Sequence, residues 1–189
     1  AYDKRKPVKS KISLIKKPEQ VKWDNLVDSD MSKWENPYDF GKAVSKDGVV
    51  NLTSEKGKWF LLTKKEYANF VFEAEIKMPV DKGNSGFMFR CQAKKNKAWG
   101  YQAEVDTQAR KWSGGLYDEG RRAWFISPNR DKAASKDEKE KSIADFRKQA
   151  GECFKQGKWN KYRIECVGSH IKISVNGVVT TDVHDEMDL

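Results

Sequence analysis

Short alternating segments, separated by turn residues roughly every 8 to 12 positions, constrain the fold of this chain most. From Phe70 to Met78 every second residue is apolar, and charged residues fill most of the positions between them. Neighbouring side chains of a β-strand point to opposite faces, so this run predicts a strand with one buried face. Similar runs cover 161–167 and 171–175, and Asn176-Gly177 is a hairpin signal. The pattern predicts an all-β fold, an antiparallel β-sandwich.

One segment departs from the strand pattern. Between Asp131 and Phe154 the apolar residues Ile143, Phe146 and Ala150 recur at helical spacing, and Gly151 follows them. We therefore expect one short helical insertion in the sandwich.

Length and charge set the domain organisation. At 189 residues the chain is long enough for one large domain, which we place at 23–189, behind a basic N-terminal arm at 1–22. The net charge of +9 raises the possibility of nucleic-acid binding, but the charges of 132–148 alternate in sign, as on a solvated helix face. We expect a solubilising arm and no nucleic-acid partner. No apolar run approaches the ~18 residues of a membrane span.

Polar residues gather on two neighbouring segments. In 83–90 and 100–106 the core positions include Phe89 and Tyr101, and we expect Phe72 and Ile164 to join them. The opposite face should carry a set of polar side chains together: Glu73, Arg90, Gln102, Glu104 and Asp106. An arginine, an amide and carboxylates on one face are typical of a site for a polar substrate.

Glu104 and Asp106 are the candidate acid-base pair. They are two residues apart on one strand, so their Cα atoms lie about 6.5 to 7 Å apart on the same face. Their flexible side chains leave open both carboxylate separations that glycosidases use. Arg90 is either the cation of the site or a structural ion-pair partner of Glu104. A divalent metal held by Glu104, Asp106 or Glu119 is an alternative, without a dedicated loop motif.

Aromatic residues, thiols and imidazoles complete the expectations. Trp99, Trp112 and Trp124 fall in loops beside the central strands and are candidates for stacking on a sugar. The strand-bordering residues Trp23, Trp34 and Trp159 are expected in the core, Cys91 and Cys166 as buried thiols, and His170 and His184 at the surface.

Four motifs carry a family resemblance. They are Gly-Asn-Ser-Gly-x-x-x-Arg at 83–90, Gly-Tyr-Gln-x-Glu-x-Asp at 100–106, Gly-x-Leu-Tyr at 114–117 and Gly-x-Trp-Asn-x-Tyr-x-Ile at 157–164, followed by Val-Asn-Gly at 175–177. With these motifs in this order, the sequence resembles the 3-keto-disaccharide hydrolase domain family. The resemblance covers residue 23 to the end.

The resemblance implies a concanavalin A-like jelly roll that acts on glycosides oxidised at C3 of the sugar. A ketone at C3 makes the C2 proton acidic, so a carboxylate, Glu104 or Asp106, can remove it while the C1 substituent leaves. Negative charge then develops on the ketone oxygen, where Arg90 is the expected cation, with Gln102 and Tyr117 as helpers. Glu119 and Trp112 complete the expected substrate-binding residues. The resemblance also implies an exported, periplasmic or secreted bacterial protein whose signal peptide has been removed.

The sequence departs from the family at its C-terminal end. Family members usually continue into a strand with a Leu-Gln-x-His-Gly type segment and a closing Phe-Arg-Asn-Ile strand, whereas this sequence stops at Leu189. We therefore expect a jelly roll that lacks its last strand, with an unpaired sheet edge. This departure motivates the alternative function, a noncatalytic carbohydrate-binding module.

Overall fold

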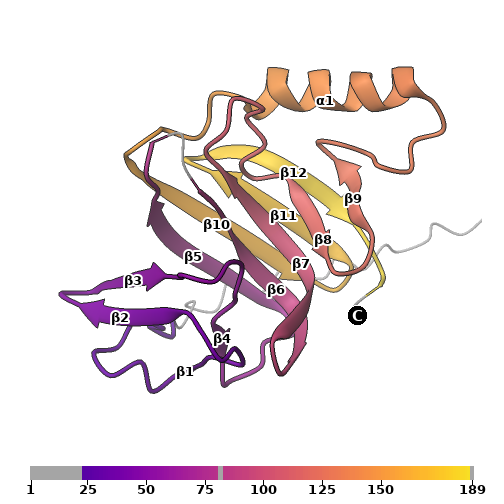
Figure 1. Ribbon diagram of the computed structural model, residues 1–189. Coiled ribbons are helices and arrows are strands. Elements are labelled where there is room, and N and C mark those ends of the chain that lie inside the picture. Colours follow the sequence, from indigo (N-terminus) through magenta and orange to yellow (C-terminus); the bar gives the residue numbers. More distant parts are fainter. Residues whose placement is uncertain (1–22, 81–82, 188–189) are drawn as a thin grey trace, which may run out of the picture.

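The computed structural model describes residues 23–80 and 83–187, which form two antiparallel sheets packed face to face (Figure 1). The first sheet has the order β12-β11-β10-β5, and the second has the order β6-β7-β8-β9. The strands of the first sheet are β5 (Phe70–Lys77), β10 (Trp159–Val167), β11 (His170–Val175) and β12 (Val178–His184). Those of the second are β6 (Asn84–Lys94), β7 (Lys97–Asp106), β8 (Leu116–Glu119) and β9 (Ala123–Ser127). The predicted antiparallel sandwich is confirmed.

The core lies between the two sheets. In β7 the inward row Tyr101, Ala103 and Val105 is fully buried. Across the interface, β10 and β11 contribute a second buried row: Tyr162, Ile164, Cys166, Ile171, Ile173 and Val175. These residues stand at alternate positions, so period-two alternation sorts each strand into an inner and an outer face. Phe89, Tyr101 and Ile164 are buried as expected, and Phe72 packs half-buried against them.

A small lobe precedes the sandwich. It contains two two-stranded sheets, one of β1 (Trp34–Glu35) with β4 (Leu62–Thr63) and one of β2 (Lys42–Lys46) with β3 (Val49–Thr53). The β2–β3 hairpin projects from one end of the sandwich (Figure 1). The ring of Trp59 lies so close to Gly41 that a Cβ there would stand 2.3 Å from it.

The predicted helical insertion is α1 (Lys136–Ala150), which lies across the opposite end of the sandwich (Figure 1). Ser135 caps its N-terminus by accepting a hydrogen bond from the backbone N–H of Glu138, at 3.1 Å. Phe146 and Ala150 are buried, each 3% exposed, so the apolar face of α1 anchors it to the sandwich.

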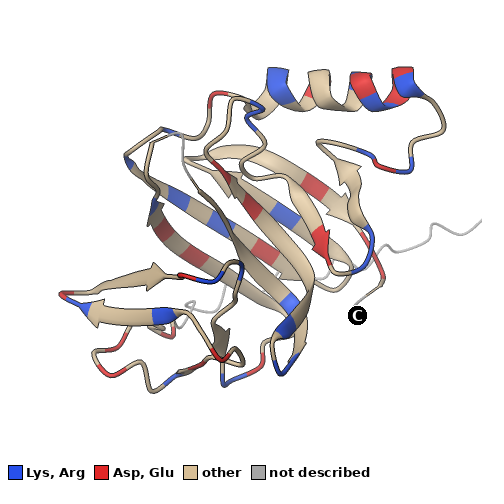
Figure 2. Cartoon of the chain, viewed as in Figure 1, with Lys and Arg blue, Asp and Glu red and all other residues tan. Residues whose placement is uncertain are grey.

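Along β5 and β10, charged residues of both signs (Figure 2) alternate with core residues and so form the outer face of this sheet. Glu73 belongs to this face, where it pairs with Lys161 at 2.8 Å and Arg163 at 2.6 Å. The expectation that Glu73 joins the outer row of β7 is therefore wrong. Alternation assigns a face to each strand, but it does not decide which sheet the strand enters.

The structure places some of the predicted tryptophan, cysteine and histidine residues as expected and others not. Trp23 and Trp159 are 54% and 50% exposed, so their assignment to the core is wrong, and Trp34 is half-buried. Cys166 is buried as expected, whereas Cys91 is half-buried. His170 and His184 lie at the surface of the β11–β12 hairpin, as expected, with their rings stacked 4.8 Å apart.

The strands β5 and β6 stand at the edges of their sheets in the described part of the chain. The basic arm at 1–22 lies outside the described residues. Within 23–80 and 83–187, no helix combines the length and apolar character that a membrane crossing requires.

Candidate functional site

The candidate site lies on the outer face of the β6-β7-β8-β9 sheet. The strand register places Gly86 opposite Glu104, and Gln102 between Met88 of β6 and Tyr117 of β8. Residues opposite one another share a face, so these side chains form one outer row, in which Glu104 and Asp106 stand together as the sequence predicts. Glycine at position 86 makes room for the row, because a Cβ there would lie 2.5 Å from the Gln102 side chain.

Glu104 is a buried carboxylate with three hydrogen-bond donors. Its Oε1 accepts from Asn84 Nδ2 at 2.5 Å and Arg110 at 3.1 Å, and its Oε2 accepts from Gln102 Nε2 at 2.8 Å. Only 3% of the residue is exposed. Burial raises the pKa of Glu104, and the donors Asn84, Gln102 and Arg110 offset that effect only in part. A carboxylate whose pKa is raised is a stronger base than an ordinary one and is suited to accept a proton.

Asp106 has a different environment. Its Oδ1 accepts from the backbone N–H of Gln108 at 3.0 Å, and its Oδ2 accepts from Arg110 Nε at 2.7 Å and from the N–H of Trp112 at 3.3 Å. These bonds shape the loop that follows β7. Asp106 is therefore occupied in holding this loop and its arginine.

Arg110 is the cation of the site, a role that the sequence pattern did not predict. Its guanidinium bonds to both Glu104 and Asp106, and it lies 4.6 Å from the centre of the Trp112 ring. Its side chain remains 31% exposed. The available sequence signal was the spacing from Asp106 to Arg110, because a loop leaving a strand can fold its fourth residue back over the strand's last carboxylate.

Arg90 does not join the site, which corrects its assignment as a substrate-binding residue. A β-bulge interrupts the β6–β7 pairing between Phe89 and Gln92, and Arg90 there has a φ of 45°. The extra residue resets the alternation of side chains. The guanidinium of Arg90 donates instead to the backbone carbonyl of Ala68, from Nε at 3.3 Å and from NH2 at 3.1 Å.

Aromatic rings border the carboxylates. Trp124 of β9 makes edge contacts with Trp112 at 5.1 Å and with Tyr117 at 4.9 Å between ring centres. Both tryptophans are buried in the core cluster, which leaves little ring surface for the sugar stacking expected of them and corrects the assignment of Trp112 as a substrate-binding residue. Tyr117 is half-buried. Burial and the nearby charge of Glu119 raise the pKa of the Tyr117 hydroxyl, which keeps it protonated as a donor.

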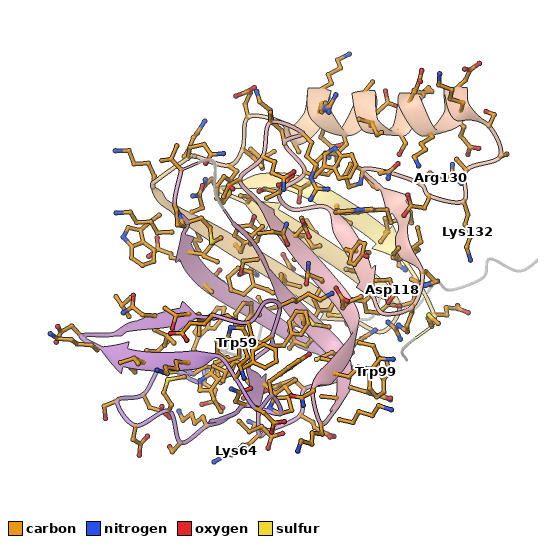
Figure 3. The ribbon with its side chains drawn as sticks, in the orientation of Figure 1. Trp59, Lys64, Trp99, Asp118, Arg130 and Lys132 are labelled. Carbon is orange, nitrogen blue, oxygen red and sulfur yellow. The ribbon has the colours of Figure 1, made fainter. Side chains whose placement is uncertain are left out.

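Glu119 and Trp99 stand farther along the sheet. Glu119 lies opposite Gly100 and pairs with Lys58 of the N-terminal lobe at 2.5 Å. Figure 3 shows Trp99 near the β6–β7 hairpin, where a Cβ on Gly120 would lie 3.1 Å from it. Trp99 is therefore separate from the Trp112–Trp124 pair.

The carboxylates do not form a metal site. Glu119 is engaged by Lys58, and Arg110 bonds to both Glu104 and Asp106, so the donor set does not fit a divalent cation. Among the described residues, no group of three or more His, Cys, Asp or Glu side chains is arranged to hold a metal ion.

Comparison with known proteins identifies the family. A family model described as the 3-keto-alpha-glucoside-1,2-lyase-like domain matches residues 22–188. The chain belongs to this family. Membership supports a carbohydrate-related function. Among curated proteins, none matches the chain.

Solved structures share the fold. A carbohydrate-binding module, CBM66, from Bacillus subtilis is 18% identical, with a TM-score of 0.50 over 82% of this chain and 81% of that one. A putative glycosyl hydrolase from Parabacteroides distasonis is 22% identical, with a TM-score of 0.55 over 87% and 73%. The predicted jelly roll is confirmed.

Proposed function

We propose that this protein cleaves glycosides whose sugar carries a ketone at C3, with Glu104 as the general base. The observation that carries the proposal is the buried Glu104 carboxylate, with its raised pKa, beside the guanidinium of Arg110. Proton abstraction next to a carbonyl needs a base of suitable pKa and a positive group near the developing negative charge. The family to which the chain belongs supports the sugar substrate.

The proposed reaction begins with transfer of the C2 proton to Glu104. The electron pair of the broken C–H bond forms an enolate, whose charge lies on the C3 oxygen within reach of Arg110. Collapse of the enolate breaks the C1–O bond, forms a C1–C2 double bond and releases the C1 substituent with its bonding electrons. The leaving oxygen takes a proton, for which the protonated Tyr117 hydroxyl is the proposed donor. Addition of water to the double bond would complete hydrolysis.

Other residues have supporting roles in the proposal. Gln102 fixes Glu104 through their 2.8 Å hydrogen bond, and Asp106 holds Arg110. The half-buried ring of Tyr117 suits the C–H face of a sugar, and it packs on the edge of the buried Trp124. We also propose an exported location, which fractionation of the producing cells would test.

Turnover of a 3-keto-glucoside tests the proposal directly. The protein is incubated with 4-nitrophenyl 3-keto-glucoside, and released nitrophenol is measured. Glu104→Gln should lower kcat by on the order of 100-fold or more. Glu75→Gln, the same change at an exposed position of β5, is the matched control and should keep full activity. Absence of turnover by the unaltered protein, or an active Glu104→Gln variant, contradicts the proposal.

A second candidate function is noncatalytic carbohydrate binding. The observation in its favour is that Glu104 is almost fully buried and already satisfied by three donors, as a structural carboxylate would be. On this reading, glycan binding measured by calorimetry survives replacement of both Glu104 and Asp106 by amides, and no sugar is cleaved.

A further inference from the structure

The loop at 107–113 places Arg110 over the carboxylates, and part of its shape is local. Besides the bonds from Asp106, the N–H of Lys111 donates to the carbonyl of Gln108 at 3.1 Å, and Lys111 has a φ of 59°. Ser113 Oγ donates to the carbonyl of Asp106 and accepts from its N–H, each at 2.9 Å. These bonds hold the two ends of the loop to β7.

The middle of the loop is held from the other side, by α1 and the turn after it. Arg147 Nε donates to the carbonyl of Arg110 at 3.1 Å. Gln156 Nε2 donates to the carbonyl of Thr107 at 2.7 Å, and Lys111 forms an ion pair with Glu152. All three contacts are polar, and each joins one side chain of the helix or the following turn to one group of the loop.

A hollow of about 240 Å³ separates the loop from the end of the helix. Its lining includes Asp106, Thr107 and Lys111 on one side and Gly151, Glu152 and Gln156 on the other. Trp112 anchors one end of the loop in the core cluster, and the part of the loop beside this hollow is held to the helix end by the polar contacts described above.

The helix is a firm support. Its buried residues Phe146 and Ala150 pack on the core cluster. Gln149 donates to the carbonyl of Val179 in β12 at 2.8 Å, and Ser142 donates to the carbonyl of Pro128 at 2.9 Å. A helix fixed to both sheets can therefore add to the local bonds that hold the ends of the loop to β7.

We propose that α1 is a positioning element of the candidate site, in which Arg147 holds the backbone of Arg110 so that its guanidinium stays over Glu104 and Asp106. This inference rests on the proposed function for its catalytic meaning. Arg147 touches neither carboxylate and acts only through Arg110.

The arrangement predicts the direction of a pH effect. The titratable groups around Glu104 are Asp106 on β7, Arg110 in the loop, Tyr117 on β8 and Tyr162 on β10, whose hydroxyl donates to the carbonyl of Glu104. Among them Arg110 lowers the pKa of Glu104 and Asp106 raises it. When Arg110 loses its position, the pKa of Glu104 should rise, so the acid limb of kcat/KM should move to higher pH.

The test compares Arg147→Ala with Lys148→Ala, a neighbouring basic residue that is exposed on the same helix turn. Arg147→Ala should lower kcat between about 10- and 100-fold and move the acid limb upward, because a misplaced catalytic group is costly. Arg147→Lys, which keeps a donor, should restore part of the rate. Gln156→Ala should act in the same direction if Arg147→Ala does not fold.

A direct titration separates this inference from the proposed function. The carboxyl carbon of Glu104 is followed by NMR against pH in the unaltered protein and in Arg147→Ala, and its pKa should be higher in the variant. An unaltered protein without turnover contradicts the proposed function, whereas the titration still decides the positioning role. An unchanged Glu104 pKa and an unchanged rate profile in Arg147→Ala overturn the inference.

Discussion

At the residue scale, two carboxylates of one strand row differ because their donors differ. Glu104 receives side-chain donors at the buried centre of the row, and burial raises its pKa. Asp106 receives two backbone N–H groups and Arg110 at the strand end, where it organises the loop. The sequence places both on one face, but it does not separate their roles.

Burial of Glu104 has a consequence for stability. A carboxyl whose pKa is raised in the folded state contributes stability below the unfolded pKa, and this contribution is lost as pH rises through the folded pKa. The difference in melting temperature between the unaltered protein and Glu104→Gln should therefore shrink, or reverse, as pH rises from 4 toward neutrality. Thermal unfolding at several pH values measures this difference. A difference that grows with pH would contradict the raised pKa.

Among the cationic residues that the structure describes, Arg110 should contribute most to turnover. Arg110→Ala removes the guanidinium that bonds to both carboxylates, and loss of such a charge-stabilising group costs about 10² to 10³ in kcat. Lys97→Ala, at the exposed β6–β7 hairpin, is the control and should be neutral. Steady-state kinetics on the 3-keto-glucoside decide the matter; activity of Arg110→Ala within about twofold of normal would remove Arg110 from the mechanism.

At the element scale, alternation predicted the faces of regular strands and failed at irregular ones. In β7 it identified Tyr101 as inward and Glu104 as outward, because the strand is regular there. In β6 the bulge after Phe89 turned Arg90 away, since two residues of one strand oppose one of its partner. Arg110 was not predicted because it lies in a loop, where side chains do not alternate between two faces as they do in a strand.

The contact between Gly86 and Gln102 can be tested as an element-level pair. Gly86→Ala should destabilise the protein by about 1 to 3 kcal/mol, since its Cβ would enter the space of the Gln102 side chain. The same change should cost much less in a Gln102→Ala background, where that space is free. Denaturant unfolding of the four proteins gives the coupling energy. Equal costs in both backgrounds would show that the strain lies elsewhere.

At the scale of the whole molecule, a network of charged side chains around the buried Asp118 links the two sheets. Asp118 of β8, shown in Figure 3, is fully buried and pairs with Arg121 at 2.6 Å and Arg122 at 2.5 Å. Arg122 also pairs with Asp185, just after β12, at 2.5 Å. Asp185 accepts the hydroxyl of Tyr101 at 2.6 Å. The network therefore ties the end of the described chain to the sheet that carries the candidate site.

The network should make Asp118 one of the most sensitive polar positions for stability. Asp118→Ala removes the buried carboxylate that Arg121 and Arg122 share, and breaking a buried ion pair by removing one partner typically costs about 3 to 5 kcal/mol. Asp182→Ala, which removes an exposed partner of His170, is the control and should leave the free energy of unfolding nearly unchanged. Chemical denaturation measures both. If the two variants unfold alike, the charged network has no role in fixing the sheet of the candidate site against its partner.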